Sequence, residues 1–401
     1  MRRSTDVDKG LVASDTGRHV ISAQTFLATL VGKGFNFFAG VPDSSLKSLL
    51  ALLEAQGVKN YICANEGAAI AVAAGYHLAT NLVPIVYMQN SGLGNAINPL
   101  LSLTHQRVYA VPILLIIGWR GEPGKADEPQ HFATGEHTTE ILQSLDIPFK
   151  IISMDSDVEE TIAEAVSTLK ESSSPFALLC RKGLFDKSVA ASIANTYEMS
   201  REEAIKILLK SLPEATAIVC TTGQAGRELY EFRESTLRES TPRESTQQNH
   251  RQDFLNVGAM GHASQIALGI ALEKPDTNVV CIDGDGALIM HMGALAIIGQ
   301  YGRRNFRHVV INNGVHDSVG GQPTAGLNID IPAIATACGY KQTASCHCAA
   351  DLPDAVHALI SADGPSLLEI RVHPGGRDNL SRPPQQFRDS KSEFMSFIKG
   401  R

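Results

Sequence analysis

The sequence predicts an α/β protein with two doubly wound parallel-sheet domains. Short apolar runs rich in β-branched residues alternate with longer stretches in which apolar residues recur at helical spacing. This alternation is typical of parallel βαβ units. The run 111–117 contains almost no polar residue, as a central strand covered on both faces should. A second alternating series begins near residue 200, so we expect two similar domains with no middle domain.

The first domain is expected to span residues 19–185, after a polar tail at 1–18 that we expect to be disordered. Helical spacing predicts helices at 19–30 and 46–56, and an alanine-rich helix from about 65 to 79. The apolar runs predict strands at 35–39, 60–63, 84–88, 111–117, 149–152 and 176–180.

A linker at 186–200 leads to the second domain, which is expected to span 201–375. A C-terminal tail follows at 376–401, with a short amphipathic segment at 394–398. The expected strands are 217–220, 279–282, 306–311 and 366–372. The expected helices are 201–212, 264–272, 288–300, 331–337 and 351–360.

A low-complexity insertion is expected at 233–250. The unit Arg-Glu-Ser-Thr occurs there three times, at a period of five residues, and Pro242 interrupts the run. This period fits neither a strand nor one face of a helix. We interpret the segment as a solvent-exposed loop.

The composition narrows the class of function. The chain has 401 residues, of which 43% are hydrophobic, enough for two full cores. The formal net charge of -7 argues against non-specific nucleic-acid binding, and no apolar run is long enough to span a membrane. The seven cysteines are scattered along the chain, which favours reduced thiols over disulfides. The N-terminal residues lack the pattern of a targeting peptide. We expect a cytoplasmic protein.

Two polar motifs follow neighbouring strands of the second domain. Gly284-Asp285-Gly286 comes after the strand 279–282, and Asn312-Asn313 ends the strand 306–311. The glycines allow a bulky anion to approach the backbone, and a helix N-terminus after them favours phosphate. Asp285 and an asparagine supply the oxygen ligands that Mg²⁺ prefers. Separately, each motif would be an ordinary turn; together they predict a site for a metal ion and phosphate.

This pair of motifs resembles the diphosphate-binding motif of thiamine diphosphate (ThDP) enzymes. The resemblance implies that Asp285 and Asn313 ligate Mg²⁺, with the backbone carbonyl of Val315 as a third ligand. It also implies that Gly284 and Gly286 contact the cofactor. Ala287 departs from the serine that often follows this motif, so one hydroxyl contact to phosphate is missing or comes from elsewhere.

Glu66 is the candidate reactive carboxylate of the first domain. It stands at a strand-to-helix junction beside Gly67 and a run of alanines, where desolvation would favour the protonated carboxyl. The alternative is a helix N-terminal Glu stabilised by the helix dipole. Residues 65–69 and 74–76 are similar to the pyrimidine-domain signature of ThDP-dependent 2-oxo acid decarboxylases. By this resemblance Glu66 activates the cofactor's aminopyrimidine.

The same resemblance assigns further cofactor contacts and a partner. Gly258 and Met260 lie in a segment similar to the one that grips the aminopyrimidine, while Thr222 and Gly223 match a position that contacts diphosphate. In this superfamily the Glu of one subunit serves the diphosphate site of another. The resemblance therefore implies at least a homodimer.

The absence of a middle domain narrows the resemblance to two-domain decarboxylases that act on phosphonopyruvate or sulfopyruvate. The segments that carry it are 40–44, 118–124, 127–131 and 314–318. The implied reaction converts 3-phosphonopyruvate to phosphonoacetaldehyde and CO₂, in phosphonate biosynthesis. Sulfopyruvate is the alternative substrate. A ThDP carboligase and a non-catalytic ThDP-binding subunit are the remaining alternatives.

The implied substrate carries two acidic groups, so we expect cationic residues and proton relays to line its pocket. Arg120 and Lys125, in a loop after a core strand, are the candidate anion contacts; the alternative is solvated loop charge. Asp43, His131 and His316 are the candidate proton relays, each with a plain surface role as its alternative. The remaining candidate substrate contacts are Ser44, Ser91 and Gly92.

Overall fold

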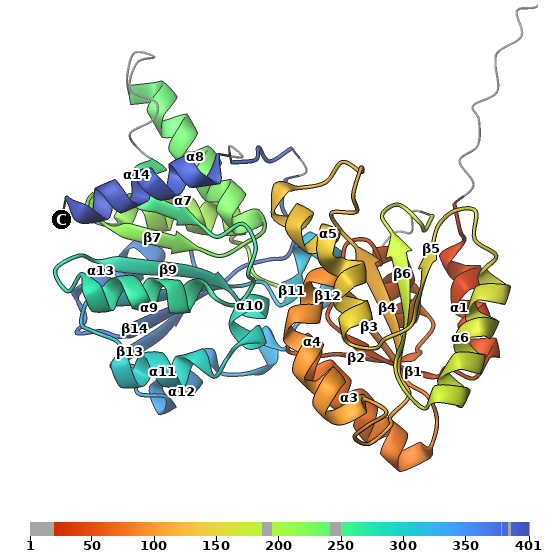
Figure 1. Cartoon of the computed structure of the whole chain (residues 1–401). Helices are drawn as coiled ribbons and strands as arrows, with labels where there is room; N and C mark the ends of the chain where they lie inside the picture. The colour runs from red at the N-terminus through yellow and green to blue at the C-terminus, as the bar shows by residue number, and fades with distance from the viewer. Residues whose placement is uncertain (1–19, 187–194, 241–249, 378, 384–385, 401) are drawn as a thin grey trace, which may run out of the picture.

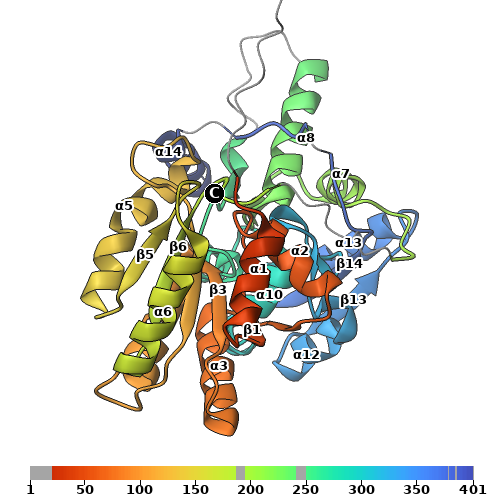
Figure 2. The same ribbon diagram turned by 90° about the vertical axis from the view of Figure 1, so that its right-hand side faces the viewer.

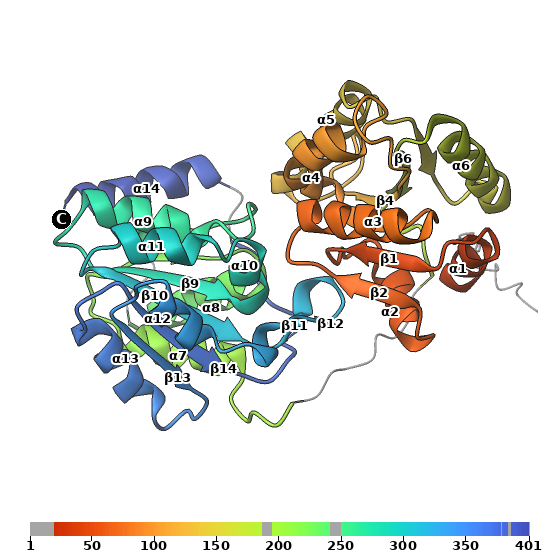
Figure 3. The same cartoon turned by 90° about the horizontal axis from the view of Figure 1, so that it is seen from below.

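A computed structural model describes residues 20–186, 195–240, 250–377, 379–383 and 386–400. The expected tail at 1–18 lies outside these residues. Two α/β domains lie side by side, and the short hairpin of β11 (Val315–His316) and β12 (Gln322–Pro323) lies between them (Figures 1 and 3).

The first domain contains a six-stranded, all-parallel sheet in the order β2-β1-β3-β4-β6-β5. Its strands are β1 Phe37–Gly40, β2 Lys59–Ile62, β3 Ile85–Gln89, β4 Leu114–Trp119, β5 Phe149–Ile152 and β6 Phe176–Arg181. Its α-helices are α1 Ala23–Gly32, α2 Lys47–Ala55, α3 Glu66–Thr80, α4 Leu93–Pro99, α5 Pro129–Ser144 and α6 Val158–Ser172.

Helices cover both faces of this sheet. Helices α1, α2 and α6 bury their apolar residues on one face, and α1 lies next to α6 (Figure 2). Helices α3, α4 and α5 cover the other face; Figure 3 shows α3 and α2 on opposite sides of β1 and β2. Ala69, Ala73 and Ala74 are buried, so the small residues of α3 bring its backbone close to the sheet.

The second domain repeats the plan with the strand order β13-β14-β10-β9-β7-β8, again all parallel. Its strands are β7 Ala217–Cys220, β8 Asp253–Leu255, β9 Val279–Gly284, β10 Phe306–Asn312, β13 Gln342–Cys346 and β14 Ser366–Arg371. Its α-helices are α7 Arg201–Ser211, α8 Gln224–Ser240, α9 Ala263–Glu273, α10 Asp285–Met290, α11 Ala294–Tyr301, α12 Ile331–Ala337, α13 Leu352–Ser361 and α14 Phe387–Lys399.

The predicted fold class is confirmed, but three local expectations need correction. The helix expected at 288–300 is two helices, α10 and α11, because His291 leaves the helical conformation. The loop expected from 233 is helical as far as Ser240. Arg233 in this helix pairs with the buried Asp253, Nε to Oδ2 at 3.0 Å, so the first residue of the repeat is attached to the start of β8. Residues 241–249 lie outside the described residues.

The C-terminal tail expected at 376–401 contains the helix α14, which packs on the second domain. Phe394 and Phe397 are buried in its core, and the ring of Phe394 lies 5.7 Å from that of Phe254. The amphipathic segment 394–398 is therefore part of a docked helix. Among the described residues, no helix has the length and apolarity needed to cross a membrane.

Candidate active site

A cavity lies at the carboxyl ends of β7, β9 and β10, where open parallel sheets bind ligands. It brings together residues of five stretches of the chain, namely Arg201, 221–225, Met260, 284–287 and 311–318. Most of the expected cofactor and metal residues line it, together with the candidate relay His316: Thr222, Gly223, Met260, Gly284, Asp285, Gly286, Ala287, Asn313 and Val315. Gly258 is not among the lining residues; it lies beside Gln130 of the first domain, whose Cβ would be 3.8 Å from a Cβ at Gly258.

Asp285 begins α10 directly after β9, and its side chain is buried. Thr324 Oγ1 donates a hydrogen bond to its Oδ2. Burial raises the pKa of Asp285 to about 6. Gly286 packs so closely that a Cβ there would lie 2.9 Å from Cε1 of His316. A side chain at this position would displace the wall of the cavity.

The two asparagines at the end of β10 have different environments. Asn312 is fully buried and donates to Gly326 O and to Glu369 Oε1, at 2.8 and 2.7 Å. Asn313 lines the cavity and donates through Nδ2 to Asp317, at 2.8 Å. The second asparagine of the pair is thus the one with access to a ligand in the cavity.

The donor groups at this cavity fit a magnesium–diphosphate group. Asp285 offers a carboxylate oxygen, Asn313 an amide oxygen and Val315 a backbone carbonyl, and all three residues line the same space. Mg²⁺ prefers such oxygen ligands and usually completes its shell with phosphate oxygens and water.

His316 also lines the cavity. Burial lowers its pKa to about 4, so the imidazole is neutral at physiological pH. A neutral imidazole accepts a proton at one nitrogen and donates at the other, which is compatible with the predicted relay.

The buried, neutral His316 predicts a pH dependence of stability. Because the imidazole takes up a proton near pH 6.5 when unfolded and near pH 4 when folded, stability is lost as pH falls through this interval. We expect the melting temperature of metal-free His316→Gln to fall less steeply than that of the wild type between pH 6.5 and 4.5. The exposed His357→Gln variant should retain the wild-type slope; an unchanged slope in His316→Gln would contradict the assignment.

Arg201 and the residues around it form a charged cluster that sequence reasoning missed. Arg201, the first residue of α7, lines the cavity and is only 6% exposed. It pairs with Glu228, Nε to Oε2 at 2.8 Å, and with Asp317, Nη1 to Oδ2 at 2.8 Å. Gln224 Oε1 accepts from its Nη2.

Glu66 is the first residue of α3, after the N-cap Asn65, and is 5% exposed. Asn95 Nδ2 donates to its Oε2 at 2.8 Å. Gly92 packs against the carboxyl group, since a Cβ at Gly92 would lie 2.4 Å from Oε1. The carboxyl group is therefore held in a defined position, with one hydrogen bond from a residue that the sequence analysis did not select.

Glu66 does not line the cavity around Asp285. The two domains do meet beside it, because Asn65 Nδ2 donates to Met290 O at 3.2 Å. Met290 ends α10, the helix that Asp285 begins. Within one chain, Glu66 and the cavity around Asp285 are therefore separate, although their domains are in contact.

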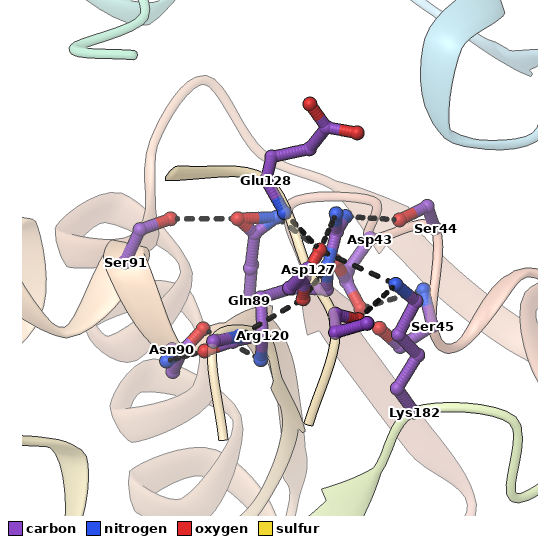
Figure 4. Close-up of polar contacts among 12 residues, drawn as sticks. Asp43, Ser44, Ser45, Gln89, Asn90, Ser91, Arg120, Asp127, Glu128 and Lys182 are labelled. Carbon is purple, nitrogen blue, oxygen red and sulfur yellow. Dashed lines mark hydrogen bonds and ion pairs between the residues drawn. The ribbon is translucent and has the colours of Figure 1, made fainter. Parts of the chain in front are cut away.

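A second polar cluster lies at the carboxyl ends of β1, β3, β4 and β6 in the first domain (Figure 4). Arg120 donates from Nε to Asp127 Oδ2 and from Nη1 to Ser44 Oγ, at 2.8 and 2.9 Å. Lys182 Nζ donates to the other oxygen of Asp127 at 3.3 Å. Two cations thus converge on one carboxylate, whose pKa lies well below its usual range because of the hydrogen bond from Arg120.

The other first-domain candidates differ in exposure. Asp43 is fully buried and accepts from Ser45 N and Gln89 Nε2, at 2.9 and 3.0 Å; burial raises its pKa. Ser91 Oγ donates to Gln89 Oε1 at 3.1 Å. Burial lowers the pKa of His131 to about 4.

Lys125 is exposed on the loop that follows β4. Its backbone N–H donates to Glu122 O at 3.0 Å. The structure thus places Arg120 in the polar cluster and Lys125 on the surface, although both were selected from the same loop.

The polar cluster of the first domain faces the loop after β11. A Cβ at Gly320 would lie 3.2 Å from Cβ of Lys47, and Lys47 begins α2 just beyond Ser44 and Ser45. The hairpin β11–β12 accordingly lies between the domains (Figure 1). The loop after β11 therefore approaches the first domain close to Ser44, a candidate substrate residue.

A protein with two α/β domains of this topology, one of which joins Gly-Asp-Gly to a strand-terminal Asn, has the plan of a thiamine diphosphate enzyme. The chain belongs to the thiamine pyrophosphate enzyme family. Residues 22–143 match the N-terminal TPP binding domain of that family, and residues 240–370 match its C-terminal TPP binding domain.

Similarity to individual members extends over nearly the whole chain. The chain is 35% identical to phosphonopyruvate decarboxylase of Streptomyces viridochromogenes, with 94% of this chain and 95% of that protein covered. It is also 35% identical to phosphonopyruvate decarboxylase of Streptomyces hygroscopicus, with 94% of each chain covered. Identity to sulfopyruvate decarboxylase of Methanosarcina acetivorans is 25%, over 88% of this chain and 92% of that protein.

Proposed function

We propose that the protein is a ThDP- and Mg²⁺-dependent carboxy-lyase that converts 3-phosphonopyruvate to phosphonoacetaldehyde and CO₂. The observation that carries the proposal is the cavity in which Asp285, Asn313 and Val315 meet. The similarity to two phosphonopyruvate decarboxylases over almost their full length supports the choice of substrate.

The chain's own residues have distinct roles in this proposal. Asp285, Asn313 and the Val315 carbonyl hold Mg²⁺, and the backbone around Gly284 and Gly286 accommodates the diphosphate. When bound, ThDP supplies the electron sink that accepts the electron pair as CO₂ leaves. Glu66 would hydrogen-bond the aminopyrimidine ring, so that the ring can act as a base.

The substrate loses its carboxylate and gains a proton at the former keto carbon. Arg120 is proposed to bind an acidic group of the substrate, with Ser44 beside it, because a guanidinium suits bidentate contacts to such groups. Lys182 adds a second positive charge at the same place. His131 and His316 are the proposed proton relays. Lys125, Asp43, Ser91 and Gly92 remain predictions as substrate or relay residues.

Sulfopyruvate is the second candidate substrate, because a sulfopyruvate decarboxylase is also similar over most of the chain. The two substrates differ in charge, since a phosphonate can carry two negative charges and a sulfonate carries one. Kinetics with saturating ThDP and Mg²⁺ separate them. We expect kcat/KM for phosphonopyruvate to exceed that for sulfopyruvate by about tenfold or more, which corresponds to ~1.4 kcal/mol of transition-state binding. A preference for sulfopyruvate would overturn the substrate assignment and leave the cofactor site intact.

A further inference from the structure

Asp317 connects the buried Arg201 to the proposed metal ligand Asn313. Its Oδ2 accepts from Arg201 Nη1 and from Asn313 Nδ2, both at 2.8 Å. Gly375 N donates to the same carboxylate, at 3.1 Å from Oδ1 and 3.0 Å from Oδ2. The carboxylate is therefore held from three directions, by groups from α7, the end of β10 and the segment after β14.

This contact fixes the orientation of the Asn313 amide. A carboxylate only accepts hydrogen bonds, so it selects the NH₂ end of the amide and turns the carbonyl oxygen away from itself. Asn313 Oδ1 accepts from Val315 N at 3.2 Å, which agrees with this orientation. If the amide rotated by half a turn, two acceptor oxygens would face each other and the cavity would lose an oxygen donor.

Arg201 in turn holds Asp317. The guanidinium is bound on its other edge by Glu228, which is 2% exposed. This paired contact to a buried carboxylate fixes the plane of the guanidinium. The segment from 313 to 318 contains β11 and the residues on either side of it, and Arg201 ties this segment to α7.

We propose that Arg201 and Asp317 are positioning residues that present the amide oxygen of Asn313 to the divalent cation of the cofactor. The inference rests on the proposed function, because it takes Asn313 as a ligand of that cation. Residues behind a metal ligand that fix its orientation typically change metal affinity by about 10–100-fold when they are removed. Asp317 thus acts on cation affinity, not on the chemical step.

The test measures cofactor binding separately from turnover. Isothermal titration calorimetry of Mg²⁺ into wild-type protein with ThDP present should give a defined affinity. Asp317→Ala should weaken that affinity about tenfold or more, and high Mg²⁺ should restore kcat to near the wild-type value. Asp317→Asn, which keeps an acceptor oxygen, should recover part of the loss. Asp354→Ala, an exposed acid on α13, should bind as the wild type does.

The outcomes distinguish this inference from the proposed function. Unchanged Mg²⁺ affinity in Asp317→Ala, with binding intact in the wild type, would overturn the positioning role alone. If metal-free Asp317→Ala melted at a lower temperature but bound Mg²⁺ with wild-type affinity when folded, Asp317 would have a purely structural role. That result would also overturn the positioning role. Failure of the wild type to bind ThDP with Mg²⁺ would overturn both the proposed function and the inference.

Discussion

Replacement of Glu66 by Gln is expected to lower kcat by about 10²–10⁴-fold, the usual contribution of a positioned acid–base group. Gln keeps the size of the side chain and retains an oxygen to accept from Asn95, so the local packing should survive. It has no carboxyl proton to share with the aminopyrimidine ring. Steady-state CO₂ release at saturating substrate, ThDP and Mg²⁺ measures the effect.

The control for this prediction is Glu54→Gln, an exposed residue of α2 in the same domain, which should retain full activity. Calorimetric affinity for ThDP should remain close to the wild-type value in Glu66→Gln, because the diphosphate site is in the other domain. Turnover by Glu66→Gln at the wild-type rate would remove Glu66 from the mechanism.

Replacement of Asp285 by Ala is expected to weaken Mg²⁺-dependent ThDP binding by about 100-fold or more. This loss is larger than the one expected for a residue that only orients a metal ligand. Among the described residues, two carboxylates line the cavity, those of Asp285 and Asp317. Asp317 is paired with Arg201, so the variant loses the carboxylate that is available to the metal ion. Calorimetry at pH 8 measures this loss directly. Wild-type affinity in the variant would refute the metal site.

The raised pKa of Asp285 adds a pH dependence to this prediction. Mg²⁺ has to displace the proton that Asp285 binds below about pH 6, so apparent affinity should fall about tenfold per pH unit below that value and level off above it. The stability of the metal-free protein should depend on pH in the opposite sense. An acid whose pKa is raised by folding favours the folded state at low pH, and that contribution is lost as pH rises to about 6.

The same two variants test whether the active site is shared between subunits. Glu66→Gln and Asp285→Ala are each expected to be nearly inactive. If Glu66 of one subunit serves Asp285 of another, mixed dimers contain one site with both residues intact. Mixing the unfolded variants and refolding them together should then recover activity. No recovery, with mixed dimers verified by differential tags, would place both residues of the site in one chain.

The motifs at strand ends could be predicted from the sequence because their signal is local. Gly-Asp-Gly follows an apolar run, Asn-Asn ends the next, and parallel strands bring their carboxyl ends to one edge. This explains why Asp285 and Asn313 line one cavity. The edge strands β8 and β13 gave no such signal, since Gln342–Cys346 is short and polar and its place in the sheet depends on pairing with β14.

The residues that hold these motifs could not be predicted, because their partners are distant in sequence. Thr324 donates to Asp285 from 39 positions away, and Arg201 reaches Asp317 across 116. Arg120 was predicted as a substrate cation and is proposed as one above, but nothing in the sequence indicated its ion pair with Asp127. Charge patterns along the chain do not show which charges pair when it folds. The ion pair between Arg233, at the start of the repeat, and Asp253 likewise could not be predicted.

Cofactor-dependent decarboxylation is best measured as CO₂ release from 3-phosphonopyruvate before and after removal of the cofactors. The protein would be dialysed against EDTA, assayed, and assayed again after addition of ThDP with Mg²⁺, ThDP alone and Mg²⁺ alone. We expect CO₂ and phosphonoacetaldehyde in equal amounts only when both cofactors are present. Equal release without them, or no release from a protein that still binds ThDP and Mg²⁺, would contradict this expectation.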